Sequence, residues 1–166
     1  MKSVFNLVLV VAVIAAGLWV WTMLFPTPES VIRGRLMSVA RLASFSPNEG
    51  NFARVASVER LGTYFAEHLE VRVDDPRLAN HNFNSRAELQ QAALAARAAV
   101  ASLQARFVDI KVKLAPDQNS AVADLTLKAE IATEKDPIWQ EMKITLQKTA
   151  GKWLINRIET IKTLNG

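Results

Sequence analysis

Tyr64 and His68 are the residues whose types and spacing best suit acid–base chemistry in this chain. Residues 52–67 have a helical pattern, and side chains four residues apart share one face of a helix. A phenol and an imidazole that share a cavity can act as a general acid–base pair or hydrogen-bond a ligand. His81, in a polar Asn-rich loop, and Trp139 would then lie at the entrance. The predicted ligand pocket therefore comprises Tyr64, His68, His81 and Trp139.

The same residues also have a purely structural interpretation, and the sequence favours it. Tyr64 would be a half-buried ring with its hydroxyl in water, and His68 a surface residue near a helix end. His81 would be part of an ordinary Asn-rich turn. No catalytic residue is therefore assigned from the sequence.

Composition excludes several other kinds of site. The chain of 166 residues has no cysteine and only two histidines, which excludes thiol nucleophiles, cysteine-bound metals and a three-histidine metal site within one chain. It has no phosphate-binding glycine loop, no His-x-x-x-His and no nucleophile elbow. Asp109, Asp124 and Glu130 fall on the polar positions of predicted strands, away from a cavity. The net charge of +4 forms no basic tract, so we expect no nucleic acid as a partner. Because the composition and the motifs offer no site for them, we expect no metal and no cofactor either.

The first 25 residues predict a membrane anchor. Residues 4–25 carry no charge, and a helix of this length is about 33 Å long, enough for a hydrocarbon core of about 30 Å. Trp19 and Trp21 lie near one end, where aromatic side chains settle at the headgroups. A cleaved signal peptide is the alternative, but its apolar region would be shorter. We expect an uncleaved signal-anchor with the following domain outside the cytoplasm, although the arginines after the span count against this orientation.

Three of these arginines form a predicted membrane-proximal basic face. Arg33 and Arg41 share a helix face, and Arg35 lies near them. They could meet anionic lipid headgroups, or simply form a solvated helix face.

Helices precede strands in the rest of the chain, which is typical of an α+β domain. Helical patterns cover residues 29–44 and 52–67, and a helix capped by Ser85 carries apolar residues to Phe107. A short strand covers residues 69–73 and ends at residues 74–76. Alternating patterns then predict long antiparallel strands from residue 108 to the end, with a turn at residues 116–120. A change of apolar parity in the last strand predicts a bulge near Asn156.

This order of elements resembles the nuclear-transport-factor-2-like superfamily, the cystatin-like and polyketide-cyclase-like cones. Residues 61–73 (LGTYFAEHLEVRV) look like that family's second helix running into its first strand. Residues 85–89 (SRAEL) look like the start of its third helix, and residues 148–155 (KTAGKWLI) like its closing hairpin. The resemblance implies about three helices packed on a bent antiparallel sheet that forms a cone. It also implies a fold shared by isomerases, dehydratases, cyclases and domains without activity.

Together these features predict a tail (1–3), a transmembrane signal-anchor (4–25), a linker (26–28) and a cone-shaped domain (29–166). The function we expect is a single-pass membrane-anchored binding or assembly module without catalysis, in a bacterial inner membrane with its domain in the periplasm. The bilayer, a homodimer or an envelope complex, and a small apolar ligand are its expected partners. The alternative is a membrane-tethered isomerase, dehydratase or cyclase-like enzyme, or a carrier, that uses Tyr64 and His68.

Overall fold

The computed structural model describes residues 2–24, 26–73 and 82–161. The chain divides into two compact units, residues 1–31 and 32–166. The first contains helix α1 (Lys2–Leu24) and the start of α2 (Pro28–Ala43). In the part of the chain that the structure describes, no helix is both long and apolar enough to cross a membrane, so the predicted transmembrane span is not supported.

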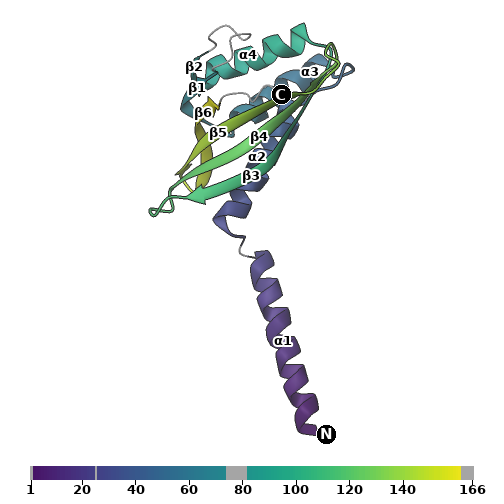
Figure 1. Ribbon diagram of the computed structural model, residues 1–166, viewed down its shortest axis with the longest axis vertical. Helices are drawn as coiled ribbons and strands as arrows, with labels where there is room; N and C mark the ends of the chain where they lie inside the picture. Colours follow the sequence, from purple (N-terminus) through teal and green to yellow (C-terminus); the bar gives the residue numbers. More distant parts are fainter. Residues whose placement is uncertain (1, 25, 74–81, 162–166) are drawn as a thin grey trace. The chain divides into compact units, whose positions relative to one another are not determined.

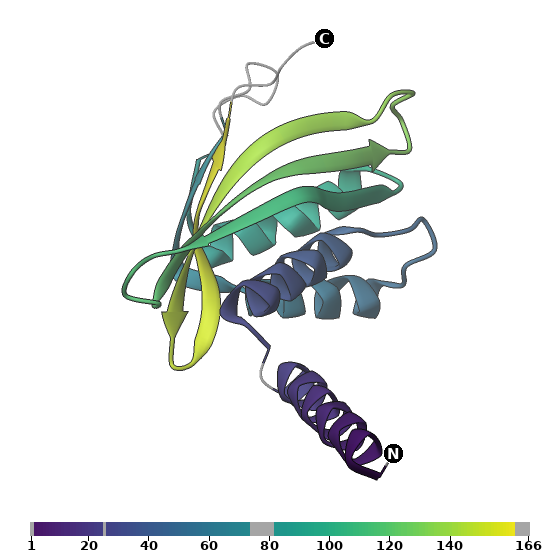
Figure 2. The same ribbon diagram turned by 60° about the horizontal axis from the view of Figure 1, so that its bottom comes forward.

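Three helices of the second unit cover one face of a sheet (Figures 1 and 2). They are α2, α3 (Asn51–Gly62) and α4 (Arg86–Ala99). Thr27 caps α2, because its Oγ1 accepts from the Ser30 N–H at 3.3 Å. Ser85 caps α4 in the same way, accepting from the Glu88 N–H. The buried face of α2 consists of Ile32, Leu36, Val39 and Ala40.

The sheet has six strands in the order β2-β1-β6-β5-β4-β3. The strands are β1 (Phe65–Arg72), β2 (Phe83–Ser85), β3 (Leu103–Leu114), β4 (Ser120–Ile131), β5 (Ile138–Thr149) and β6 (Lys152–Thr160). The α+β class is confirmed, but the expectation of a wholly antiparallel sheet is wrong, because β1 and β6 pair in parallel. The predicted turn before β4 is confirmed. There the Asn119 backbone N–H donates to the Asp117 carboxylate and lowers its pKa.

Two helix predictions are wrong at their ends. The helix expected over 52–67 stops at Gly62, and Phe65 already belongs to β1. The helix expected to carry Leu103 and Phe107 stops at Ala99, and both residues lie in β3. The predicted turn at 74–76 lies outside the described residues.

The core lies between the helices and the face of the sheet that they cover, which we call the inner face. One row across it pairs Ala121 with Leu146, Leu146 with Ile155, and Ile155 with Phe65. All four side chains are 3% exposed or less. At about 25 cal/mol per Å² of buried apolar surface, such rows supply the main stabilisation of the fold. These four side chains form a sealed row, which closes the core at this end of the domain.

Bulges interrupt two strands. Leu146 pairs with Ile155 and Thr145 with Arg157, so Asn156 has no partner on β5, and the predicted bulge is confirmed. A second bulge in β3, at Asp109 (φ 53°), was not predicted. It places Val108 opposite Thr126 on the outer face, whereas the sequence pattern put Val108 on the apolar side.

Arg97 joins α4 to the connection between α2 and α3. Its side chain is 2% exposed, and its Nη1 lies 2.5 Å from Glu49 Oε2. Its Nη2 donates to the Leu42 carbonyl oxygen, and the guanidinium lies 5.0 Å from the centre of the Phe45 ring. A buried cation is tolerated only with such partners, so this residue fixes the helices to one another.

Candidate functional site

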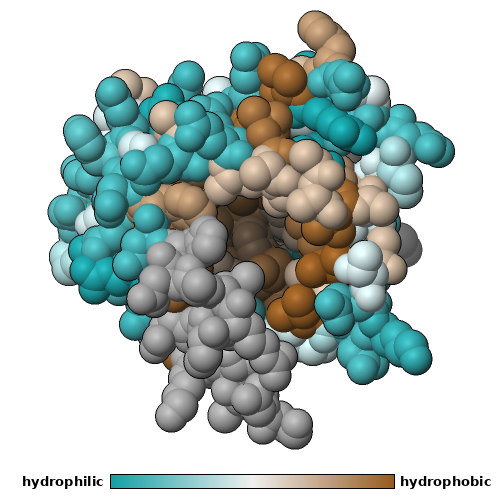
Figure 3. Space-filling view, turned by 90° about the horizontal axis from the view of Figure 1, so that it is seen from above, coloured by the Kyte–Doolittle hydropathy of each residue, from teal (hydrophilic) through white to brown (hydrophobic). Residues whose placement is uncertain are grey.

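An apolar hollow opens at the end of the domain opposite the sealed row. Figure 3, which views the domain from above Figure 1, shows a depression whose surface is apolar. At this end of the sheet the inner-face side chains Phe107 and Met142 pack against the core but are only partly buried. The core is therefore closed at one end and open at the other.

Gln140 brings a polar group to the open end. In register with Leu127, it falls on the inner face. Its Nε2 donates to the Ile161 carbonyl oxygen at 2.7 Å. In the described strands β3 to β6, the positions of this face hold no Asp, Glu or His. Gln140 was not among the predicted site residues, although its alternation with Met142 and Ile144 places it on the apolar side of the strand.

The structure does not bring Tyr64 and His68 together as expected. They cannot share a helix face, because α3 ends at Gly62 and His68 lies in β1. Tyr64 packs against the core, and the Arg35 guanidinium lies 4.5 Å from the centre of its ring. His68 is exposed on the opposite face of the sheet, the outer face. The acid–base pair therefore lacks the shared helix face on which the prediction depended.

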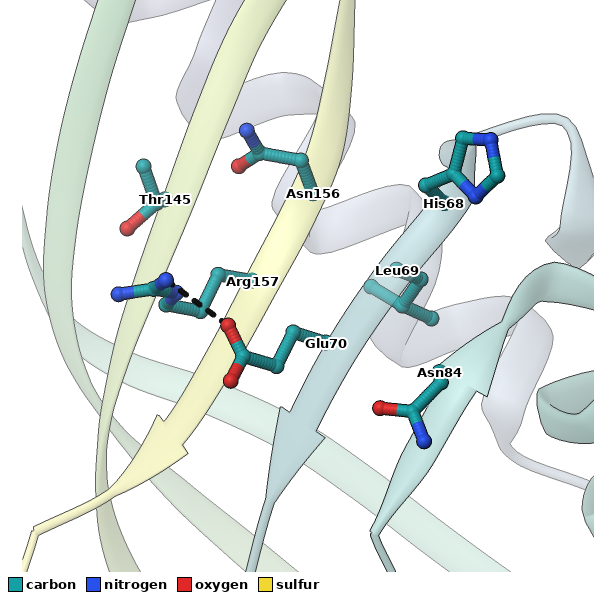
Figure 4. A pocket seen from close by; sticks show the side chains of 7 residues that line it. All are labelled: His68, Leu69, Glu70, Asn84, Thr145, Asn156 and Arg157. Carbon is teal, nitrogen blue, oxygen red and sulfur yellow. Dashed lines mark ion pairs between the residues drawn. The ribbon is translucent and has the colours of Figure 1, made fainter.

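His68 lines a polar pocket of about 510 Å³ on the outer face, which we call the outer pocket (Figure 4). Arg157 of β6 and Glu70 of β1 point toward each other at its centre, with Nη2 and Oε2 2.8 Å apart. The helices lie behind the strands in this view, on the inner face. The remaining residues of the wall are Leu69, Asn84, Thr145 and Asn156.

The outer pocket exists because the pairing of β1 with β6 is interrupted. Phe65 pairs with Ile155 and Glu70 with Arg157, so four residues of β1 face a single residue, Asn156, in β6. The two strands therefore cannot form a regular parallel ladder through this stretch. The bulge also turns Asn156 and Arg157, which are consecutive, toward the same wall.

Trp139 lies in neither of these places. It is 50% exposed on the outer face, opposite Lys128, whose ammonium nitrogen is 5.5 Å from its ring centre. Lys128 also pairs with Glu130 at 2.7 Å and lowers the pKa of that carboxyl. Lys128 and Glu130, but not Trp139, line a second polar depression of about 660 Å³, which β3, β4 and residues 132–137 form. His81, the last predicted pocket residue, lies outside the described residues.

The predicted basic face has two exposed members. Arg33 and Arg41 are exposed on α2 with Met37, 54% exposed, between them. Arg35 instead covers the ring of Tyr64. No cluster of three metal-binding side chains occurs among the residues that the structure describes.

Comparison with known proteins gives the fold. No family model matches the chain, and no curated protein matches it. Among solved structures, it is similar to a proposed scytalone dehydratase of Novosphingobium aromaticivorans, with a TM-score of 0.62, 15% identity, and 81% and 83% of the two chains covered. A proposed aromatic ring hydroxylase of the same organism gives 0.64 at 9% identity, with 82% and 90% covered.

A third structure carries the fold in its description. It is an NTF2-like protein with a cystatin-like fold, also from N. aromaticivorans, with a TM-score of 0.61, 16% identity, and 89% and 86% of the chains covered. Identities this low establish architecture and no activity. The chain has the nuclear-transport-factor-2-like, cystatin-like fold.

Proposed function

We propose that the domain is a binding module that takes a small apolar molecule into the hollow of its inner face. The observation that carries this proposal is the apolar surface of the hollow at the open end of the core. Ligand sites of this kind are mostly apolar, with a few polar groups that orient the ligand. Gln140 at the open end is a polar group of this kind, and its Nε2 donates to the Glu141 and Ile161 carbonyl oxygens. The body of the ligand would lie against Phe107 and Met142.

Catalysis in the hollow is the second candidate, since structural neighbours include a proposed dehydratase and a proposed hydroxylase. Acid–base chemistry needs a titratable group within hydrogen-bonding reach of the ligand. The described inner positions of β3 to β6 hold no Asp, Glu or His, and His68 lies on the outer face. Binding without chemistry therefore has the stronger support.

Replacing Leu127 with tryptophan tests the hollow. Leu127 is partly buried on the inner face between Phe107 and Gln140, and a larger ring there would occupy the space of the ligand. We expect the affinity for 1-aminoanthracene, an apolar fluorescent probe, to fall about tenfold or more, a change of about 1.4 kcal/mol per factor of ten. Fluorescence titration measures it.

Thr126→Trp is the matched control, because it places the same ring on the outer face of the same strand. It should leave probe binding unchanged, and so should the double variant Tyr64→Phe, His68→Ala. Equal binding by Leu127→Trp and the parent chain would contradict the proposal. Loss of binding in the double variant would instead favour the enzyme or carrier that uses these two residues.

The second part of the proposal is that residues 4–25 hold this module at a lipid bilayer, with the domain in the periplasm of a bacterium. The sequence supports it through the charge-free run between Lys2 and Glu29. In α1 the large apolar side chains from Val10 to Trp21 are about half exposed or more. A homodimer or an envelope complex remains the expected assembly.

Two lysines introduced into α1 test the attachment. Val11→Lys with Ile14→Lys should move the chain from the membrane pellet to the supernatant after alkaline carbonate extraction, since each buried lysine costs about 2.5–3.5 kcal/mol in a bilayer. Arg33→Lys with Arg41→Lys, which keeps the charge, is the control. A parent chain that is itself released by carbonate would contradict membrane attachment. A reporter fused after Gly166 tests the periplasmic location.

A further inference from the structure

The outer pocket presents opposite charges side by side. The Glu70 carboxylate contacts Arg157 through one oxygen and Arg72 through the other. Their side chains are 33%, 46% and 60% exposed, respectively. Ion pairs this accessible to water contribute about 0–1 kcal/mol each. A charged group of a ligand can therefore take the place of one partner in such an ion pair at a small cost in free energy.

Asn156 has a side-chain oxygen that lacks a hydrogen bond within the described part of the chain. Its Oδ1 is shielded from solvent and has no hydrogen-bond partner in the part of the chain that the structure describes. An unpaired buried acceptor costs about 1–3 kcal/mol, which a ligand N–H or O–H would recover only after a rotation of the side chain that turns Oδ1 into the pocket. Because of the bulge, this oxygen and the Arg157 guanidinium belong to consecutive residues of one wall.

We propose that the outer pocket binds a small zwitterion, a molecule with an ammonium and a carboxylate a few bonds apart, such as a free α-amino acid. The ammonium donates to the Glu70 carboxylate. The carboxylate accepts from the Arg157 guanidinium and from the Thr145 hydroxyl. A simple anion would use Arg157 but leave Glu70 without a partner, and a simple cation would do the reverse.

The size and position of the outer pocket agree with this ligand. A volume of about 510 Å³ lies within the range of small-molecule sites, about 300–1,000 Å³. The pocket opens on the outer face, so it is independent of the hollow and of the proposed apolar ligand. His68 and Asn84 form the rim farther from Arg157 and face the side chain of the ligand (Figure 4).

The test is an NMR titration of the full chain in detergent with L-alanine as the probe. We expect saturable shifts of the amide signals of Glu70, Asn156 and Arg157. Acetate, ethylamine and glycerol at the same concentration should produce no saturable shift. Saturation by acetate alone would show a simple anion site, and saturation by glycerol a polyol site. Either result, or the absence of saturation with L-alanine, would overturn the proposal.

Arg157→Gln should weaken L-alanine binding about tenfold or more, because a charge-assisted hydrogen bond is lost. Lys143→Gln is the matched control, since Lys143 is exposed on the same face but does not line the pocket. Deleting Asn156 is a second variant. It makes the β5–β6 ladder regular and keeps Ile158 on the inner face, so it should abolish alanine binding while 1-aminoanthracene still binds in the hollow. Alanine binding that survives both changes would contradict the assignment.

Discussion

Replacing Arg97 with alanine is expected to lower the free energy of unfolding by about 3 kcal/mol. Removing one partner of a buried ion pair typically costs about 3–5 kcal/mol, because the other charge is left uncompensated. The lower end applies here, since Glu49 retains 16% exposure and can recover some hydration. The Leu42 carbonyl also loses its donor, and Phe45 loses the cation beside its ring. Urea unfolding followed by circular dichroism measures the change.

Two further variants separate charge from packing. Arg97→Met keeps an apolar stem of similar length, and combined with Glu49→Gln it should recover part of the lost stability, because no unpaired charge remains. Arg41→Ala, an exposed arginine on α2, should change stability by about 0.5 kcal/mol or less. If Arg97→Ala matches Arg41→Ala, the ion pair does not hold the helices together.

Ile144→Ala is expected to have a comparable or larger effect on stability. Ile144 is 1% exposed and pairs on the inner face with Ala123 and Ile158. Truncating a buried isoleucine costs about 2–5 kcal/mol, and more where the surroundings cannot collapse into the cavity. The side chain of Ala123 is a single methyl group that cannot move into the cavity, so we expect the upper half of that range. The midpoint of urea unfolding should fall while the dependence on urea concentration stays the same.

Lys143→Ala is the control for this truncation, because the neighbouring side chain points to the outer face and is exposed. It should change stability by about 0.5 kcal/mol or less. Equal effects at the two positions would mean that the sheet faces are assigned the wrong way round.

Local patterns predicted the fold class, the Ser85 helix cap and the bulge at Asn156, since each depends on neighbours in sequence. They failed where a strand follows a helix directly. Leu103 and Phe107 continue the helical spacing of α4, yet a spacing of four also satisfies the period of two in a strand. Pairing with Ile131 and Leu127 of β4 decides between the two, and that contact is not local.

The difference between local and non-local contacts also explains why the candidate site was predicted only in part. His68 was selected for its chemistry and does line a pocket, but on the face of the sheet away from the core. Its partners there, Glu70 and Arg157, are brought together by the parallel pairing of β1 with β6, which no pattern within either segment reveals. Gln140 could have been found, because the alternation Gln140, Met142, Ile144 places it on the apolar side.

The bulge at Asp109 shortens the regular strand edge that β3 offers to another molecule. β3 is the last strand of the sheet and has 12 residues, long enough to template the addition of a strand from another molecule. Asp109, in a left-handed conformation that aspartate tolerates, breaks this edge into two short segments that cannot both pair in one register. At the other edge, β2 has only three residues. Neither edge of the described sheet therefore offers a long regular template for polymerisation.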